Sequence, residues 1–185
     1  MIGQLTIYGD IAIDDIFIDT KSSCRPTASC TFEDSLCLWS QLETNSFNLL
    51  RITTEQLQSF KNNTQANQIF FDTTTNTKYG HFLWTSSTNF QQSSTFKNKT
   101  SILSETIIAK NFPLGTCFNF MYLISGPKSD SKINVYKKLT SNDAKIILFS
   151  TKADQQSNKI WKPAFITLDG TKDNFELYLE VEIGI

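Results

Sequence analysis

Residues 175–183 read Phe-Glu-Leu-Tyr-Leu-Glu-Val-Glu-Ile, with an apolar side chain at every second position. Glu176, Glu180 and Glu182 fall between these apolar residues. Successive side chains of a β-strand point to opposite faces of a sheet, so this alternation indicates a strand with one buried face and one wet face. The segment predicts that the core of this protein is built on a half-buried β-sheet.

Several other segments have the character of strands. Residues 117–124 are apolar on both faces, as expected of a central strand, and residues 132–137 alternate strictly. Further strands are predicted at residues 9–18, 145–150 and 162–168. Turn sequences rich in Gly, Pro, Asn and Asp separate these segments. Short strands joined by such turns predict an all-β fold, either an antiparallel sandwich or a barrel.

Helix signals are weak along the whole chain. No segment has the period of a long amphipathic helix. Residues 54–61 have room for a turn or two of helix, but the wider stretch 43–68 is rich in Asn, Gln and Thr. A long surface loop is therefore predicted for residues 43–68.

Length and charge narrow the possible classes of protein. The chain has 185 residues, 17 basic and 18 acidic, which is enough for one sizeable domain and gives a net charge of -1. No basic excess points to nucleic acid, and no apolar run is long enough to cross a bilayer. Residues 1–20 lack the pattern of a signal peptide, so any secretion signal is expected outside this chain.

The four cysteines, at positions 24, 30, 37 and 117, allow three disulfide pairings. Cys30 and Cys37 are close in sequence, so a bond between them needs a turn. The chain has no Cys-x-x-Cys pair, and its single histidine, His81, cannot supply a zinc site of the usual composition. The even number predicts disulfides and an oxidising compartment, and the alternative is free, buried cysteines of an intracellular protein.

A series of landmarks follows in a definite order along the chain. They are Cys30-Thr31-Phe32-Glu33, Leu36-Cys37-Leu38-Trp39-Ser40-Gln41, Asn45-Ser46-Phe47-Asn48-Leu49, Asp72-Thr73-Thr74, Gly80-His81-Phe82-Leu83, Ile102-Leu103-Ser104, Cys117-Phe118-Asn119-Phe120-Met121-Tyr122, Trp161 and Phe175. In this combination the chain resembles the MAM domain, an extracellular module named from meprin, neuropilin and the mu-type receptor phosphatases. The resemblance implies a two-sheet antiparallel jelly-roll β-sandwich.

The ends of the chain depart from the family order. A MAM domain finishes with a motif like Asp10-Ile11-Ala12-Ile13-Asp14-Asp15-Ile16 and then a cysteine, and here that motif stands at the front, with Cys24 after it. We expect one MAM-like domain over residues 1–185, one period of a tandem array. Residues 1–24 would be the final-strand motif of one repeat, and residues 25–185 the body of the next.

The displaced motif carries a structural expectation. Residues 4–19 are expected to fill the missing place in their own sandwich, beside residues 175–183, as in a circular permutant. The alternative is a swap, in which this strand completes a neighbouring molecule. The resemblance also implies two disulfides, one between Cys30 and Cys37 and one between Cys24 and Cys117.

The resemblance further implies a cation site. Some MAM domains hold a structural cation near the Phe-Glu and Asp-His-Thr segments, which here would use Glu33 and Asp72, with Asp15 as a further ligand. Oxygen atoms of distant carboxylates can converge on one calcium ion. Thr73 replaces the histidine of the family. The alternative is that these carboxylates order the loops through hydrogen bonds or ion pairs, and no other cofactor is expected.

Two sequons are candidate glycosylation sites, Asn62-Asn63-Thr64 and Asn98-Lys99-Thr100. Both lie in polar stretches that are expected to be loops. Glycans attached to Asn62 and Asn98 would suit an extracellular protein.

Little in the sequence points to catalysis. No nucleophile and base stand in a known arrangement, and Asp14 and Asp15 are expected on opposite faces of a strand. We therefore expect a non-catalytic extracellular recognition or adhesion module of a larger secreted or membrane-anchored protein. Its partner would be another protein or a second copy of itself, on the cell surface or in the matrix, and not nucleic acid. The alternatives are a carbohydrate-binding jelly roll and an accessory domain of an extracellular protease.

Overall fold

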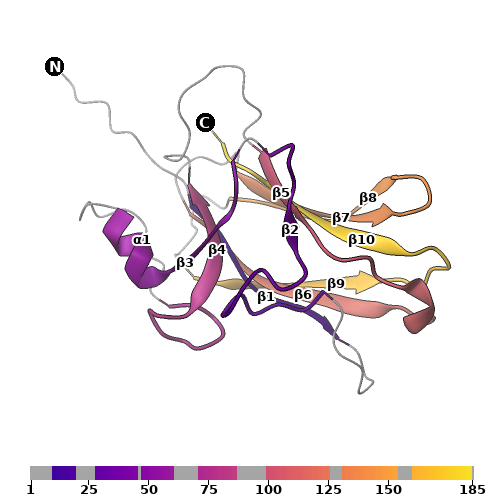
Figure 1. Ribbon diagram of the computed structural model, residues 1–185, viewed down its shortest axis with the longest axis horizontal. Coiled ribbons are helices and arrows are strands. Elements are labelled where there is room, and N and C mark those ends of the chain that lie inside the picture. The colour runs from indigo at the N-terminus through magenta and orange to yellow at the C-terminus, as the bar shows by residue number, and fades with distance from the viewer. Residues whose placement is uncertain are drawn as a thin grey trace.

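The computed structural model describes residues 10–19, 28–45, 47–60, 71–86, 99–125, 131–153 and 160–184. In these ranges the strands form two antiparallel five-stranded sheets that face one another (Figure 1). The predicted all-β, two-sheet sandwich is therefore confirmed. Within the same ranges, no helix has the length and apolar character needed to cross a membrane.

The two sheets are named here after their central strands. The β1 sheet has the order β3 (Leu50–Thr53), β4 (His81–Ser86), β1 (Asp10–Asp19), β6 (Thr116–Ser125) and β9 (Lys162–Leu168). The β10 sheet has the order β2 (Ser40–Gln41), β5 (Lys99–Leu103), β10 (Phe175–Glu182), β7 (Lys132–Leu139) and β8 (Lys145–Lys152). Two short helices, α1 (Thr54–Phe60) and η2 (Ala109–Asn111), complete the described elements.

The N-terminal strand completes the sandwich of its own chain, as expected. β1 pairs with β4 on one side and β6 on the other, both antiparallel. The expected neighbour was wrong, because residues 175–183 belong to the opposite sheet, where β10 lies between β5 and β7. Alternation shows which face of a strand is buried, but it does not identify the strand that pairs with it.

The core lies between the two sheets. The inward residues of β10, which are Phe175, Leu177, Leu179 and Val181, are at most 2% exposed. They belong to one cluster with inward residues of β1 and β6, among them Ile13, Phe118 and Phe120. Burying each such side chain stabilises the fold by roughly 1.5–3 kcal/mol. The alternation in residues 175–183 therefore correctly predicts which side chains of this strand are buried in the core.

The long loop predicted at residues 43–68 is wrong for residues 50–60, which form β3 and α1. Thr53 and Gln56 cap the helix reciprocally. The Thr53 N–H donates to Gln56 Oε1 at 2.9 Å, and the Gln56 N–H donates to Thr53 Oγ1 at 3.1 Å. Leu57 of α1 then packs with Ile52 in a second apolar cluster. Tertiary packing makes a helix from a stretch of polar composition.

Candidate functional site

The Cys30–Cys37 disulfide closes a turn beside β1. The two Cα atoms are 5.8 Å apart. Cys30 exchanges two backbone hydrogen bonds with Ile16, in which the Ile16 N–H donates at 2.9 Å and the Cys30 N–H at 2.8 Å. These two hydrogen bonds hold the turn, which the disulfide closes, against the N-terminal strand.

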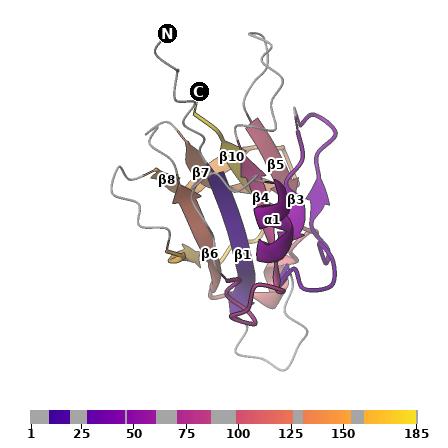
Figure 2. The ribbon, with the colours of Figure 1, turned by 90° about the vertical axis from the view of Figure 1, so that its left-hand side faces the viewer.

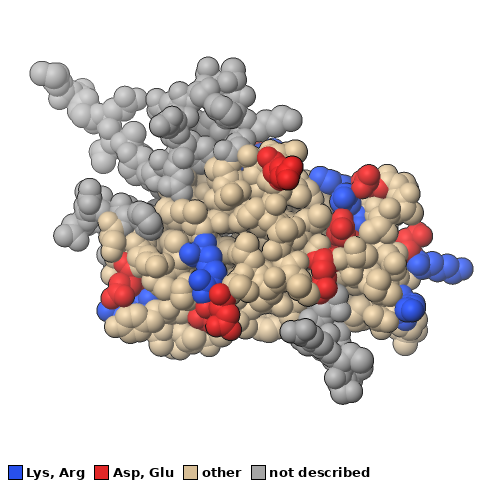
Figure 3. All heavy atoms as spheres, viewed as in Figure 1, with Lys and Arg blue, Asp and Glu red and all other residues tan. Residues whose placement is uncertain are grey.

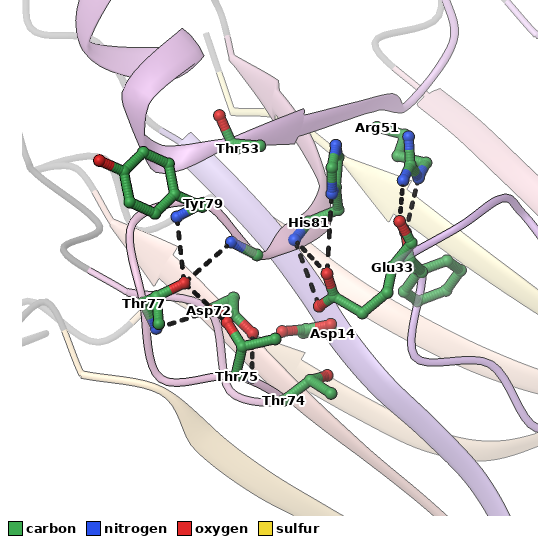
Figure 4. Close-up of polar contacts among 12 residues, drawn as sticks. Asp14, Glu33, Arg51, Thr53, Asp72, Thr74, Thr75, Thr77, Tyr79 and His81 are labelled. Carbon is green, nitrogen blue, oxygen red and sulfur yellow. Dashed lines mark hydrogen bonds and ion pairs between the residues drawn. The ribbon is translucent and has the colours of Figure 1, made fainter.

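The backbone of the same turn also accepts hydrogen bonds from Arg51 of β3 (Figure 4). Its Nε donates to the carbonyl oxygen of Phe32 at 2.5 Å, and its Nη2 donates to the carbonyl oxygen of Glu33. The Glu33 carboxylate accepts the backbone N–H of His81 at 3.2 Å, and its Oε2 lies 3.7 Å from His81 Nδ1. The backbone carbonyl groups of Phe32 and Glu33 thus bind Arg51 of β3, and the Glu33 side chain binds His81 of β4.

Asp72 organises the loop that leads into β4. Its carboxylate accepts the Thr75 N–H at 2.6 Å, the Thr75 hydroxyl at 2.7 Å and the Thr77 N–H at 3.0 Å. Burial raises the pKa of Asp72, but the hydrogen bonds from Thr75 and Thr77 together outweigh it and hold that pKa below its ordinary value. A Cβ atom on Gly80 would lie 2.1 Å from Asp72 Cγ, so only glycine fits beside this carboxylate.

Asp14 and Asp15 lie together, contrary to the prediction that they point to opposite faces. The register of β1 against β6 shifts between Asp14 and Phe17, and Asp15 has a φ of 47°. Such a bulge redirects a side chain. The Thr73 hydroxyl lies 2.8 Å from Asp14 Oδ2 and 2.7 Å from Asp15 Oδ2. The bulge therefore brings two carboxylates to one threonine of the 72–80 loop.

Asp14 is fully buried, and this decides its charge. Burial raises the pKa of Asp14 from 3.8 to about 7; the hydrogen bonds from Thr73 and the N–H of Asp15 lower it, and the nearby Asp15 charge raises it. Between pH 3.8 and about pH 7, the folded protein therefore holds a proton on this carboxyl group that the unfolded chain has already released.

The stability of the protein is expected to fall as pH rises through about 7. A raised carboxyl pKa favours the folded state fully below 3.8, and this contribution is lost as Asp14 ionises near 7. Urea unfolding at about pH 5 and pH 8 is expected to differ by on the order of 3 kcal/mol. Asp14→Asn removes this titration, so its two curves should lie closer together. An equal pH dependence in both proteins would contradict the assignment to Asp14.

The three predicted cation ligands already have donors from the protein. Asp72 and Glu33 accept the hydrogen bonds given above, and Asp15 accepts those of the Thr73 and Thr74 hydroxyls. The described ranges contain no group of three His, Cys, Asp or Glu side chains that could hold a metal ion. The residues therefore fit the alternative better, in which the carboxylates order the loops by hydrogen bonding. A structural cation stays a prediction.

Removal of metal is expected to leave the melting temperature unchanged. The loop anchors described above are hydrogen bonds between protein groups, and these do not need an ion. Thermal melting in EDTA and in added Ca²⁺ measures this directly. A melting temperature that rises with Ca²⁺ and falls again with EDTA would show a stabilising ion.

Three of the predicted site residues, Cys24, Asn62 and Asn98, lie outside the described residues. Cys117 is the second residue of β6 and pairs with Asp19 of β1. Its side chain is exposed. It forms no disulfide with either of the other described cysteines. The pairing of Cys24 with Cys117 stays a prediction.

Sequence reasoning missed an exposed apolar surface on the β1 sheet. Phe165 of β9 is 75% exposed and Phe17 of β1 is 42% exposed. The sequence does hold a signal, since Phe165 is out of phase with the buried residues Ala164, Ile166 and Leu168 of its strand. The signal is clear only once the buried face of β9 is known.

Charge on the surface is sparse and mixed in sign. On the face seen in Figure 3, uncharged residues cover most of the surface, and Lys and Arg are interspersed with Asp and Glu. The described part of this face carries no single-sign patch of the kind that attracts a polyanion.

The sequence matches a known family model over residues 30–184, described as MAM domain, meprin/A5/mu. The matched range begins at Cys30, the first cysteine of the clipped turn, and continues past β10. MAM domains are extracellular modules of the adhesion type and are generally non-catalytic. Because the match spans nearly the whole chain and the observed sandwich agrees with it, this chain belongs to the MAM domain family.

Proposed function

We propose that this chain is a non-catalytic adhesion module of a larger extracellular protein, and that it associates with a second copy of itself. Membership of an extracellular adhesion family and the Cys30–Cys37 disulfide support this proposal. The observation that carries it is the apolar surface left open on the β1 sheet.

The outer face of the β1 sheet is covered over only part of its length. Ala12 of β1 and Leu123 of β6 point outward and are buried in the cluster that includes Leu57 of α1. Figure 2 shows α1 lying beside β3 and β4. Phe17, further along β1, and Phe165, on the neighbouring strand β9, remain exposed. Exposed large apolar side chains that gather on one face are typical of protein–protein contacts.

Sedimentation velocity over a wide range of protein concentration tests the proposal. The weight-average sedimentation coefficient is expected to rise with concentration, and beads coated with the protein are expected to cluster. A constant monomer coefficient together with dispersed beads would refute self-association.

A second candidate function is glycan binding on the β10 sheet. Register places Leu103, Tyr178, Tyr136 and Ile147 in one row across four neighbouring strands. Aromatic rings on a jelly-roll face suit sugars, but Lys145 Nζ lies 3.4 Å from the centroid of the Tyr178 ring and covers it. A glycan array with the wild type and Tyr136→Ala would support this function only if binding is seen and the variant loses it.

We also propose that residues 1–24 act as the closing segment of this domain and that Cys24 bonds to Cys117. β1 ends at Asp19, opposite Cys117, and Cys24 follows five positions later in the sequence. Peptide mapping without reduction is expected to recover Cys24 linked to Cys117 and Cys30 linked to Cys37. A Cys24–Cys30 or Cys37–Cys117 peptide would contradict this pairing.

A further inference from the structure

One row of side chains crosses the open part of the β1 sheet. Register places Phe17 of β1 beside Asn119 of β6, and Asn119 beside Phe165 of β9. All three point outward, because their neighbours Ile16, Ile18, Phe118 and Ile166 face the core. We call the three residues the Phe17–Asn119–Phe165 row.

We infer that two copies of this chain associate face to face through this row, so that each residue of the row meets the same residue of the other copy. The inference rests on the proposed self-association and names its surface and geometry. A two-fold axis across the strands at Asn119 produces this arrangement, in which one patch serves both partners.

The absence of charge in the row itself favours a second copy as the occupant. Phe17, Asn119 and Phe165 bear no formal charge, and neither do the outward neighbours on β6 and β9, which are Met121, Pro163 and Thr167. When like residues meet across a two-fold axis, any charge would face its own sign, and that contact would be repulsive. An uncharged row is therefore suited to meeting itself.

The other candidate surfaces lack this property. The outer face of the β10 sheet carries a ladder of ion pairs, such as Lys132–Glu182 at 3.0 Å and Lys138–Glu176 at 3.2 Å. Burying such pairs in a contact costs desolvation energy. Among the described strands, β8 is the last of the β10 sheet, and it begins with Lys145 and ends with Lys152. Antiparallel pairing of two β8 strands would bring these lysines together.

Asn119 supplies a polar group that pairs with itself. Its Oδ1 is buried and makes no hydrogen bond within the described part of the chain. A carboxamide both donates and accepts, so the amides of two Asn119 residues can bond reciprocally once the row is covered and the side chain turns. An unpaired buried acceptor has a cost that such a contact removes.

The shape of the sheet face sets the direction of the axis. The part of the face over Ala12 and Leu123 is raised by the cluster that includes α1, whereas the row on β1, β6 and β9 lies outside that cluster. An axis across the strands places the raised part of each copy beyond the row of the other. An axis along the strands would set the two raised parts against each other.

The contact is expected to be weak and reversible. Phe17 is 42% exposed and Phe165 is 75% exposed, so the rings of both copies together supply roughly 350–600 Å² of contact. That area is below the range of stable specific interfaces and is typical of a weak, transient contact. Display of many copies on a surface would strengthen such a contact by avidity.

Charge reversal at Phe165 tests the inference in the full chain. Phe165→Asp and Phe165→Lys are each expected to weaken self-association about tenfold or more, because like charges then meet at the contact. An equimolar mixture of the two variants is expected to recover the dimer, since Asp then meets Lys. Sedimentation velocity measures all three samples, and thermal melting checks that each variant is folded.

Ile147→Asp is the matched control, since Ile147 is 57% exposed on β8 of the other sheet. Its dimer is expected to be as stable as that of the wild type. If the wild type associates and Phe165→Asp associates equally well, this surface is wrong while self-association stands. If Phe165→Asp and Phe165→Lys are each monomeric and their equimolar mixture is monomeric too, Phe165 does not meet Phe165 of the other copy, and the proposed geometry is overturned. A wild type that never associates refutes the proposed function itself.

Discussion

Removing residues 1–19 is expected to leave a chain that does not fold. β1 lies between β4 and β6, so its loss would expose the edges of both neighbouring strands. Its residues Ile11, Ile13, Ile16 and Ile18 are at most 2% exposed. Their burial contributes on the order of 6–12 kcal/mol in total, which is comparable with the whole stability of a typical domain, roughly 5–15 kcal/mol.

Far-UV circular dichroism and proton NMR dispersion measure this outcome. Phe17→Ser in the full chain is the control on the same strand, because Phe17 faces away from the core. It is expected to change the free energy of unfolding by about 1 kcal/mol or less. A truncated chain that keeps a dispersed spectrum and a cooperative melting transition would contradict the central place of β1.

Gly80→Ala is expected to destabilise the protein by about 3 kcal/mol or more. The new Cβ would lie 2.1 Å from Asp72 Cγ, so the buried carboxylate would have to move. The backbone N–H groups of Thr75 and Thr77 would then lose their acceptor. Overpacking and unsatisfied donors each cost roughly 1–3 kcal/mol. Urea unfolding of the variant and the wild type measures the difference.

A double-mutant cycle with Asp72→Ala separates this clash from a general intolerance of alanine at position 80. In the Asp72→Ala background, Gly80→Ala is expected to cost less than about 1 kcal/mol, because the obstructing carboxylate is gone. An equal cost in both backgrounds would show that Asp72 is not the cause.

The sequence predicted most of the strands because their cause is local. Alternation in residues 175–183 and 132–137 follows directly from one buried face, and the structure has β10 and β7 there. β3 was missed, and a loop was preferred to the turn or two of helix noted at residues 54–61, because Asn, Gln and Thr dominate that region. There the helix depends on the Thr53–Gln56 cap and on packing of Leu57, and the packing is a tertiary effect.

The parts of the site that could not be predicted depend on pairing between distant segments. The family resemblance indicated Glu33, Asp72 and Asp15, but not Asp14, because alternation fails where β1 has a bulge. Arg51 could not be connected to the Cys30–Cys37 turn, because its acceptors are main-chain carbonyls, which have no sequence signature. The exposed row emerges only from the register of β1, β6 and β9.

The central claim is that this MAM domain associates with its own copy through the Phe17–Asn119–Phe165 row. Amide NMR spectra of the isotopically labelled chain, recorded at rising concentration, test it most directly. The amide signals of Phe17, Asn119 and Phe165 are predicted to shift with concentration, while those of Tyr136, Tyr178 and Ile147 stay in place. Shifts confined to the β10 sheet, or none on the row while the protein associates, would contradict the account.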